Sequence, residues 1–299
     1  MKLLSGTSNT PLAKQIADHF SLPLINTEIS EFGNGERRIW IKESLSGQDV
    51  VITQSLAHPT DTNIMELLLL CDAVERLGAR DVHLLVPWLG YSLQDKAFRQ
   101  GEAIAAKVVA NLLSSAYVRR VYLLDVHNTS IPGFFSVPTL HLSAMELFKQ
   151  HVRTELKPEN IVVASPDFGG LKRARQFADM LDTELVNIDK HRDLNSGQIE
   201  SSILHGDVKG KTVLVYDDTI QSGGTVVEAA DTLKEQGAEK VIFFATHGPM
   251  VEAAFKKIGQ SSIDQVIVTN SVAHHDIAVS KLKTIDVSPV FTTALEEWF

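Results

Sequence analysis

Two adjacent aspartates followed by a loop of small residues have the residue types and spacing to bind a sugar phosphate. Asp217 and Asp218 end an apolar run over 213–216, and residues 222–225, Ser-Gly-Gly-Thr, precede a helical pattern over 226–236. This order is typical of a strand, a tight loop and a helix. The loop would present backbone N–H groups at the positive end of the helix, which suits a phosphate group. The two carboxylates could accept hydrogen bonds from ribose hydroxyls or hold Mg²⁺. The alternative is an ordinary turn with two solvated acids.

Other polar residues follow predicted strands, at the end of a parallel sheet where ligands bind in α/β folds. A polar loop after the strand 184–188 carries Lys190 and Arg192, which could close over a phosphoryl group and stabilise developing charge. Such a charged loop is otherwise a solvated turn. His127, beside Asp125 at a strand end, could ligate a metal ion or contact a nucleotide phosphate. Two further strand ends carry Asp167 and His247.

Composition narrows the class of protein. The chain has 299 residues, enough for two domains with cores of their own, and 44% of them are hydrophobic. The net charge of −9 argues against a broad nucleic-acid surface, which needs clustered Lys and Arg. No apolar run approaches the ~20 residues that span a bilayer, so we expect no membrane partner. Because Cys71 is the single cysteine, no intrachain disulfide can form, and we expect a cytoplasmic protein.

Strand and helix patterns alternate along the sequence, which predicts an α/β fold with mainly parallel sheets flanked by helices. A boundary near residue 143 would divide the chain into two domains with the same alternation, 1–143 and 144–299. We expect strands at 50–53, 82–86, 121–124, 161–164, 184–188, 213–216 and 241–245, and helices at 63–77, 103–113, 144–152, 171–181 and 226–236.

Several segments, taken together, resemble motifs of the ribose-phosphate diphosphokinases, or PRPP synthetases, over nearly the entire chain. The loop that starts at Asp217 is similar to the PRPP-binding motif that this family shares with type I phosphoribosyltransferases. The other matching segments are Phe32-Gly33-Asn34-Gly35-Glu36, Pro59-Thr60 with residues 63–67, Asp125-Val126-His127 with residues 131–135, and residues 165–170 with Arg173-Ala174-Arg175. The resemblance implies two stacked phosphoribosyltransferase-like domains, with the ATP side in 1–143 and the ribose 5-phosphate side in 144–299.

The resemblance also implies an activity and the residues that carry it. The family transfers the β,γ-diphosphoryl group of ATP to the 1-hydroxyl of ribose 5-phosphate, giving PRPP and AMP, with Mg²⁺ as cofactor. By this resemblance Lys190 and Arg192 stabilise the transition state, and His127 and Asp167 hold Mg²⁺. The turn 32–36 would come from a neighbouring subunit, which implies a homo-oligomer. Ribose 5-phosphate would be bound by Asp217, Asp218, Gln221, Ser222, Gly223, Gly224 and Thr225, and ATP by Phe32, Asn34, Glu36, Gln94, Asp95 and His127.

The chain departs from the family pattern on the expected ATP side. Leu93 stands where the family has an arginine, and Asn34 where it has an aspartate. Gln221 replaces an aspartate at the head of the phosphate loop, and the segment 96–102 is closer to archaeal-type members. Two alternatives stay open: a phosphoribosyltransferase that consumes PRPP, and a non-catalytic paralogue that regulates an active partner. The first would leave Lys190 and the whole first domain without a role.

Overall fold

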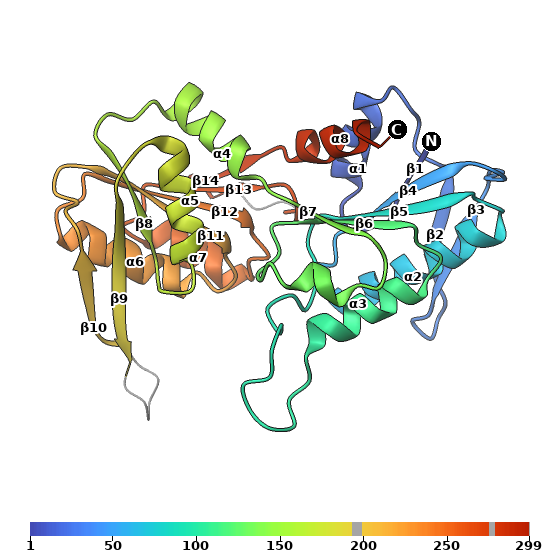
Figure 1. The fold of residues 1–299 in the computed structure, drawn as a ribbon, viewed down its shortest axis with the longest axis horizontal. Coiled ribbons are helices and arrows are strands. Elements are labelled where there is room, and N and C mark those ends of the chain that lie inside the picture. The colour runs from blue at the N-terminus through green and yellow to red at the C-terminus, as the bar shows by residue number, and fades with distance from the viewer. Residues whose placement is uncertain (193–198, 275–278, 299) are drawn as a thin grey trace. The chain divides into compact units, whose positions relative to one another are not determined.

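The computed structural model describes residues 1–192, 199–274 and 279–298, and the chain divides into two compact units (Figure 1). The first unit comprises Met1–Ser143, Asn270–Ala273 and Asp286–Phe299, and the second comprises Ala144–Thr269 and His274–Ile285. Two short segments of the expected 144–299 domain therefore group with the first unit.

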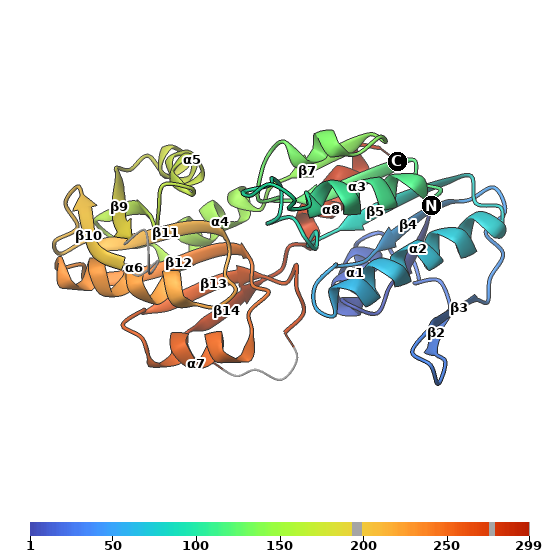
Figure 2. The same ribbon diagram turned by 90° about the horizontal axis from the view of Figure 1, so that it is seen from below.

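The first unit is built on a five-stranded parallel sheet in the order β1-β4-β5-β6-β7. Helices α2 and α3 cover one face of this sheet, and α1 and α8 cover the other (Figure 1, Figure 2). Strands β2 and β3 form a separate antiparallel hairpin. The bounds are β1 Lys2–Ser5, α1 Thr10–His19, β2 Thr27–Glu31, β3 Arg37–Ile41, β4 Asp49–Thr53, α2 Thr60–Arg76, β5 Asp81–Val86, α3 Ala105–Ser115, β6 Arg120–Leu124, the 3₁₀ turn Ile131–Phe134, β7 Thr139–Leu142 and α8 Ser288–Glu296.

The second unit is built on a seven-stranded sheet in the order β10-β9-β8-β11-β12-β13-β14, in which only β9 and β10 pair antiparallel. Helices α4 and α5 lie on one face and α6 and α7 on the other (Figure 1, Figure 2). The bounds are α4 Met145–His151, the π-helical turn Val152–Leu156, β8 Ile161–Ser165, α5 Leu171–Leu181, β9 Leu185–Arg192, β10 Ile199–His205, β11 Thr212–Thr219, α6 Gly224–Glu235, β12 Lys240–His247, α7 Glu252–Gln260, β13 Gln265–Thr269 and β14 Leu282–Ile285.

The two units repeat one topology. In each, a strand and helix are followed by a hairpin, and the remaining strands add to the sheet in chain order. The order β1-β4-β5-β6-β7 in the first unit thus corresponds to β8-β11-β12-β13-β14 in the second. Loops at the same position in the two units can therefore be compared directly.

Four buried aromatic rings fix the face of the second sheet on which α5 lies. Phe177 of α5 packs against Tyr216 of β11 with ring centroids 4.9 Å apart, and against Phe244 of β12 at 5.5 Å. Phe148 of α4 contacts the same two strand residues at 6.0 and 5.4 Å. Each of these rings is at most 1% exposed, so they tie α5 firmly to the strand that ends in Asp217.

The predicted α/β fold with mainly parallel sheets flanked by helices is confirmed. The predicted polar loop after residue 188 is wrong for residues 189–192, because β9 continues to Arg192 and pairs with β10; residue 193 lies outside the described residues. Backbone pairing with a neighbouring strand satisfies the N–H and C=O groups there whatever the side chains, so the run of charges does not end the strand. Among the described helices, none is both long enough and apolar enough to cross a membrane.

Candidate functional site

The loop between β11 and α6 has the shape of an anion cradle. Ile220 N–H donates to the His247 carbonyl at 2.9 Å, and Val251 N–H donates to the Gln221 carbonyl at 3.2 Å, so both sides of the loop are anchored. Gly223 has φ 72°, a left-handed conformation that favours glycine, and it directly precedes α6. The helix begins at Gly224, two residues earlier than predicted.

Backbone donors of this loop remain available for a ligand. Among the hydrogen bonds between described residues, none uses the N–H groups of Ser222 or Gly223. Gly224 and Thr225 open the helix, where N–H groups have no acceptor within the helix itself. The side chains of Gln221 and Ser222 are exposed. The predicted phosphate-binding residues are therefore brought together around one helix N-terminus.

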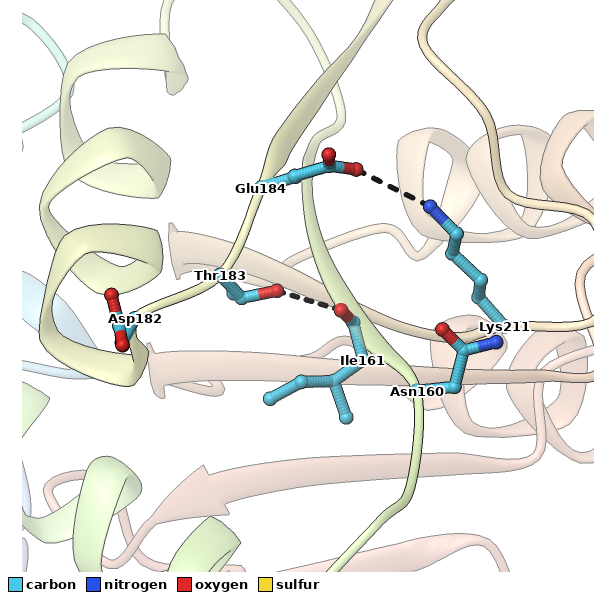
Figure 3. A pocket seen from close by; sticks show the side chains of 6 residues that line it. All are labelled: Asn160, Ile161, Asp182, Thr183, Glu184 and Lys211. Atoms are coloured by element: carbon cyan, nitrogen blue, oxygen red, sulfur yellow. Dashed lines mark hydrogen bonds and ion pairs between the residues drawn. The ribbon is translucent and has the colours of Figure 1, made fainter.

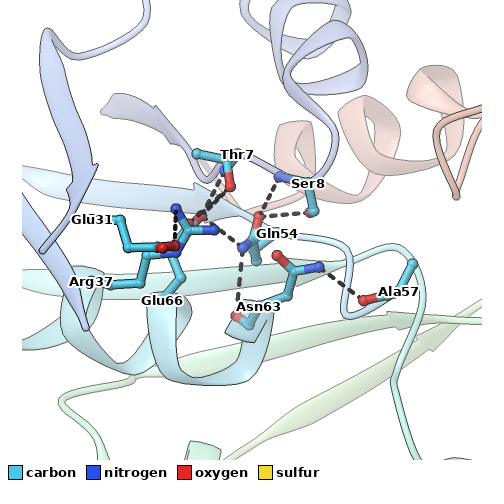
Figure 4. Close-up of polar contacts among 8 residues, drawn as sticks. All are labelled: Thr7, Ser8, Glu31, Arg37, Gln54, Ala57, Asn63 and Glu66. Carbon is cyan, nitrogen blue, oxygen red and sulfur yellow. Dashed lines mark hydrogen bonds and ion pairs between the residues drawn. The ribbon is translucent and has the colours of Figure 1, made fainter. Parts of the chain in front are cut away.

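The equivalent loop of the first unit uses more of its backbone donors within the protein. After β4, the N–H groups of Gln54, Ser55 and Leu56 donate to Leu85, Ser8 and Trp88 at 2.8–3.0 Å. The Gln54 side chain accepts from Ser8 and donates to Glu66 (Figure 4). Three successive backbone donors after β4 are thus occupied within the protein, whereas Ser222 and Gly223 of the second unit's loop donate to no described residue.

Asp217 and Asp218 stand at the carboxyl end of β11, and Arg173 of α5 binds both. The Arg173 Nη2 group donates to Asp218 Oδ1 at 2.6 Å and to Asp217 Oδ1 at 3.3 Å. Asp217 Oδ1 also accepts the Asp218 backbone N–H at 2.8 Å. The Asp218 side chain is 4% exposed, whereas that of Asp217 is 21% exposed. Arg173 was part of a motif that the sequence singled out, but its contact with these carboxylates was not predicted.

Asp217 and Asp218 carry two carboxyl groups, and one guanidinium, that of Arg173, bonds to both of them. Burial raises the pKa of Asp217, and the adjacent carboxyl of Asp218 raises it further, while Arg173 partly opposes both effects. Two carboxyls therefore share one guanidinium in a largely buried place. Such a group of hard oxygen donors fits Mg²⁺, whose charge would offset the second carboxylate.

Asp167 organises the loop that leads into α5. Its Oδ1 accepts the Gly170 N–H at 2.9 Å, and its carbonyl accepts the Ser165 hydroxyl at 2.6 Å. The side chain is only partly buried, so a second role as a metal ligand is sterically open. Within the described residues, however, no three His, Cys, Asp or Glu side chains gather as a preformed metal site.

Three of the residues predicted for ATP lie in neighbouring loops of the first unit. Asp95 accepts a hydrogen bond from Asn128, the residue after His127, at 2.6 Å. Gln94 adjoins Asp95 and is exposed. Asp125 holds a φ of 33°, and His141 Nε2 accepts the N–H that follows it, at 3.2 Å. Partial loss of solvent around the ring lowers the pKa of His141, which favours the neutral form that can accept this bond.

The other predicted ATP residues form the exposed turn of the β2-β3 hairpin. Phe32 N–H donates to the Glu36 carbonyl at 2.8 Å, and Asn34 Oδ1 accepts the Glu36 N–H at 3.2 Å. The Phe32 side chain is 51% exposed. The hydrogen bonds described for this turn stay within it and do not reach Gln94 or His127.

The predicted catalytic pair, Lys190 and Arg192, lies at the far end of β9. The backbone of Lys190 and Arg192 belongs to β9, opposite Ser202 and Ile199 of β10. Their side chains lie outside the part of the chain that the structure describes.

A pocket of about 450 Å³ opens at the opposite edge of the second sheet (Figure 3). Ile161 is the first residue of β8, and Lys211 directly precedes β11. Lys211 forms an ion pair with Glu184 at 3.3 Å across this opening. Because Asp217 and Asp218 lie at the other end of β11, this pocket is separate from the predicted sugar-phosphate site.

Comparisons with known proteins identify relatives of this chain over nearly its full length. A family model described as the N-terminal domain of ribose phosphate pyrophosphokinase matches residues 1–116, and the phosphoribosyl synthetase-associated domain matches residues 196–299. The ribose-phosphate pyrophosphokinase of Chlorobaculum tepidum is 41% identical over 99% of this chain and 91% of its own length. That of Fusobacterium nucleatum is 37% identical over 99% and 94%.

A solved structure agrees over the full length. The crystal structure of phosphoribosylpyrophosphate synthetase from Mycobacterium smegmatis covers 100% of this chain and 98% of its own, with a TM-score of 0.94 and 33% identity. With relatives this similar over nearly all of both chains, and with the aspartate pair and anion cradle in place, the chain belongs to the ribose-phosphate pyrophosphokinase family.

Proposed function

We propose that the protein transfers the β,γ-diphosphoryl group of ATP to the 1-hydroxyl of ribose 5-phosphate, giving PRPP and AMP. The observation that carries this proposal is the pairing of Asp217 and Asp218 with an anion cradle whose N–H groups at Ser222 and Gly223 are not used within the described protein. A sugar phosphate supplies the complementary groups: a dianion for the loop and hydroxyls for the carboxylates.

The second unit supplies the acceptor side of the reaction. Residues 221–225 bind the 5-phosphate, and Asp217 and Asp218 accept hydrogen bonds from the ribose hydroxyls. The 1-hydroxyl oxygen then forms a bond to the β-phosphorus of ATP, the bond from that phosphorus to the α,β-bridging oxygen breaks, and AMP leaves. The hydroxyl proton is lost in this step. Alignment and charge neutralisation carry such transfers, and Lys190 and Arg192 supply two cations for them.

The first unit supplies the nucleotide side. Gln94, Asp95 and His127 bind ATP from adjoining loops, and the turn residues Phe32, Asn34 and Glu36 bind it from a neighbouring subunit. The protein is thus proposed to be a homo-oligomer, and its compartment to be the cytoplasm. His127 and Asp167 are proposed to hold Mg²⁺, which would neutralise phosphate charge when bound.

Leu93 favours a second candidate, a non-catalytic paralogue that regulates an active partner. Its side chain packs against an apolar cluster of Ala57, Trp88 and Val272, so this position offers a nucleotide no cation. Retention of Lys190 and Arg192 favours the enzyme, because a regulator has no need of transition-state cations.

An assay of the purified protein with ribose 5-phosphate, ATP and Mg²⁺ separates the two candidates. We expect AMP and PRPP in equal amounts, and no product when Mg²⁺ is chelated. Absence of AMP with ATP and with other nucleotide donors, in the presence of added phosphate, would support the regulatory paralogue. Release of diphosphate from PRPP when a nucleobase is added would instead point to a phosphoribosyltransferase.

A further inference from the structure

Arg173 makes the shortest described contact to the aspartate pair. Its Nη2 lies 2.6 Å from Asp218 Oδ1 and 3.3 Å from Asp217 Oδ1, so one nitrogen bridges the two carboxylates. A charge-assisted bond of 2.6 Å is at the short end for a guanidinium and a carboxylate. The Arg173 side chain is 24% exposed, which shields the contact partly from water.

The elements that carry this contact are fixed by packing. Along β11, alternate side chains face opposite sides of the sheet, so Asp218 shares a face with Tyr216. Phe177 of α5 packs on Tyr216, and Arg173 precedes Phe177 by four residues, one helical turn. The guanidinium is thereby placed beside Asp218. The bond from Gly170 N–H to Asp167 fixes the start of the same helix.

The charges give the contact a consequence beyond packing. Adjacent carboxylates in a low-dielectric place repel each other, and each can accept a proton or rotate away to relieve the repulsion. Either response would remove an acceptor that a ribose hydroxyl needs. A bridging guanidinium opposes both responses, because its hydrogen bonds are strongest to ionised oxygens that are turned toward it.

We propose that Arg173 is a positioning residue of the ribose 5-phosphate site: it holds the carboxylates of Asp217 and Asp218 in one orientation, so that both accept hydrogen bonds from the sugar. The inference rests on the proposed function in so far as it takes ribose 5-phosphate as the ligand of this pair. Arg173 acts through the two aspartates and does not itself contact the sugar.

The test compares Arg173→Met with Arg173→Lys in the full-length protein. Binding of ribose 5-phosphate is measured by calorimetry without nucleotide, and KM for each substrate and kcat are measured in the coupled assay. We expect Arg173→Met to weaken ribose 5-phosphate binding by about 30-fold or more, because a buried charge pair loses one partner. Arg173→Lys should recover part of this loss, since it keeps the charge without the planar fork. KM for ATP should change less than about twofold, because Arg173 is proposed to act on the sugar site alone. A general loss of structure would instead raise KM for both substrates.

Arg76→Met is the matched control, because Arg76 forms an exposed pair with Asp72 at 2.7 Å and lies in the first unit. Arg76→Met should leave ribose 5-phosphate binding and KM for both substrates unchanged. Unchanged ribose 5-phosphate binding in Arg173→Met, or equal weakening of both substrates, would overturn the inference. Should Arg173→Met fail to fold, unchanged sugar binding in Arg173→Lys would overturn it instead. Wild-type protein that binds ribose 5-phosphate but forms no AMP contradicts the proposed function alone.

Discussion

Asp217 is the residue at which ligand binding and stability conflict most directly. Its pKa is raised by burial and by the charge of Asp218, so the native protein binds the proton of this carboxyl more tightly than the unfolded chain does. The stabilising effect of that proton is present at low pH and is lost as the pH rises through the folded-state pKa. A sugar hydroxyl, however, donates its stronger hydrogen bond to the ionised carboxylate.

Asp217→Asn should therefore separate the two properties. We expect the variant to melt at a higher temperature than the wild type at alkaline pH, with the difference shrinking as the pH falls. Wild-type binding of ribose 5-phosphate should strengthen from about pH 7 to about pH 9, where the phosphate is already mostly dianionic, and this dependence should be absent in the variant. Calorimetric melting and binding over this range measure both effects.

Asp72→Asn is the control for this experiment. The pKa of Asp72 is lowered by its hydrogen bond and charge pairing with Arg76, and the side chain is exposed. Neutralising it should bring no gain in stability at alkaline pH. A wild-type affinity for the sugar that stays flat over the pH range would contradict the account of Asp217.

Lys190 belongs to the transition state in the proposed reaction, so Lys190→Ala should affect turnover more than binding. We expect kcat to fall by at least ~100-fold, because a cation that stabilises developing charge is lost, while the affinity for ribose 5-phosphate stays nearly unchanged. Steady-state kinetics together with calorimetric binding provide the measurement. A variant with weakened sugar binding and near-normal turnover would contradict this role.

At the scale of residues, the sequence predicts the phosphate loop but does not predict the contact of Arg173 with the aspartate pair. The phosphate loop is continuous in sequence, and its order of apolar strand, acids and small residues predicted the cradle around Gly223. The contact of Arg173 with Asp218 joins residues 45 positions apart, which local spacing does not reveal. A signal was present: alternation along β11 places Asp218 on the face of Tyr216, and a helix packed there must supply its counter-charge.

At the scale of elements, the β9-β10 hairpin departs most from what the sequence predicts. Periodic helices such as α2 and α5 were predicted to within three residues of their observed ends, because an amphipathic stripe marks their length. Strand β10 was missed because it is an edge strand whose partner, β9, is charged at its far end. Pairing of this kind depends on a neighbour in space rather than on periodicity.

A buried polar network adds to the apolar contacts of Ile39 and Ile41 that attach the β2-β3 hairpin to the rest of the first unit. Glu66 of α2 is fully buried and accepts the Thr7 N–H and hydroxyl at 2.7–2.9 Å and the Gln54 amide at 2.9 Å (Figure 4). Arg37, the first residue of β3, places its Nε 3.7 Å from the same carboxylate. The network therefore connects the hairpin to the ends of β1 and β4.

Glu66→Ala should be strongly destabilising. Loss of the carboxylate removes the acceptor of the Thr7 N–H and hydroxyl, and it leaves the Gln54 amide with Asn63 and Arg37 with Glu31 as their remaining partners. We expect a cost of about 3–5 kcal/mol. Urea unfolding measures the change. Asp72→Ala on the same helix removes an exposed ion pair and should cost less than about 1 kcal/mol. Similar costs for the two variants would show that the network adds no stability.

At the scale of the whole molecule, the division into units does not follow the order of the chain. Helix α8 belongs to the first unit, where it packs against α1 and β7, although it follows every segment of the second. Phe291 and Leu295 of α8 are fully buried. The expected simple boundary at residue 143 missed this return, since nothing in local sequence marks which sheet a terminal helix covers.

Phe291→Ala should loosen the first unit, with a cost of about 3–5 kcal/mol for the buried ring. Limited proteolysis with mass-spectrometric mapping should find new cleavage sites within residues 1–143. Thr293→Ala changes an exposed position of the same helix and should leave the cleavage pattern as in the wild type. New sites confined to 144–269 would contradict the assignment of α8 to the first unit.

The late position of α8 in the chain also determines the sequence of events on the ribosome. Residues 286–299 are translated after all of the second unit. The first unit therefore begins to emerge from the ribosome before the second but is completed after it. Nascent domains usually mature from the N-terminus onward, and here that order is reversed. A ribosome that stops just before residue 286 releases a chain with a complete second unit and a first unit that lacks α8. The α1 surface that α8 would cover is then exposed to chaperones and proteases.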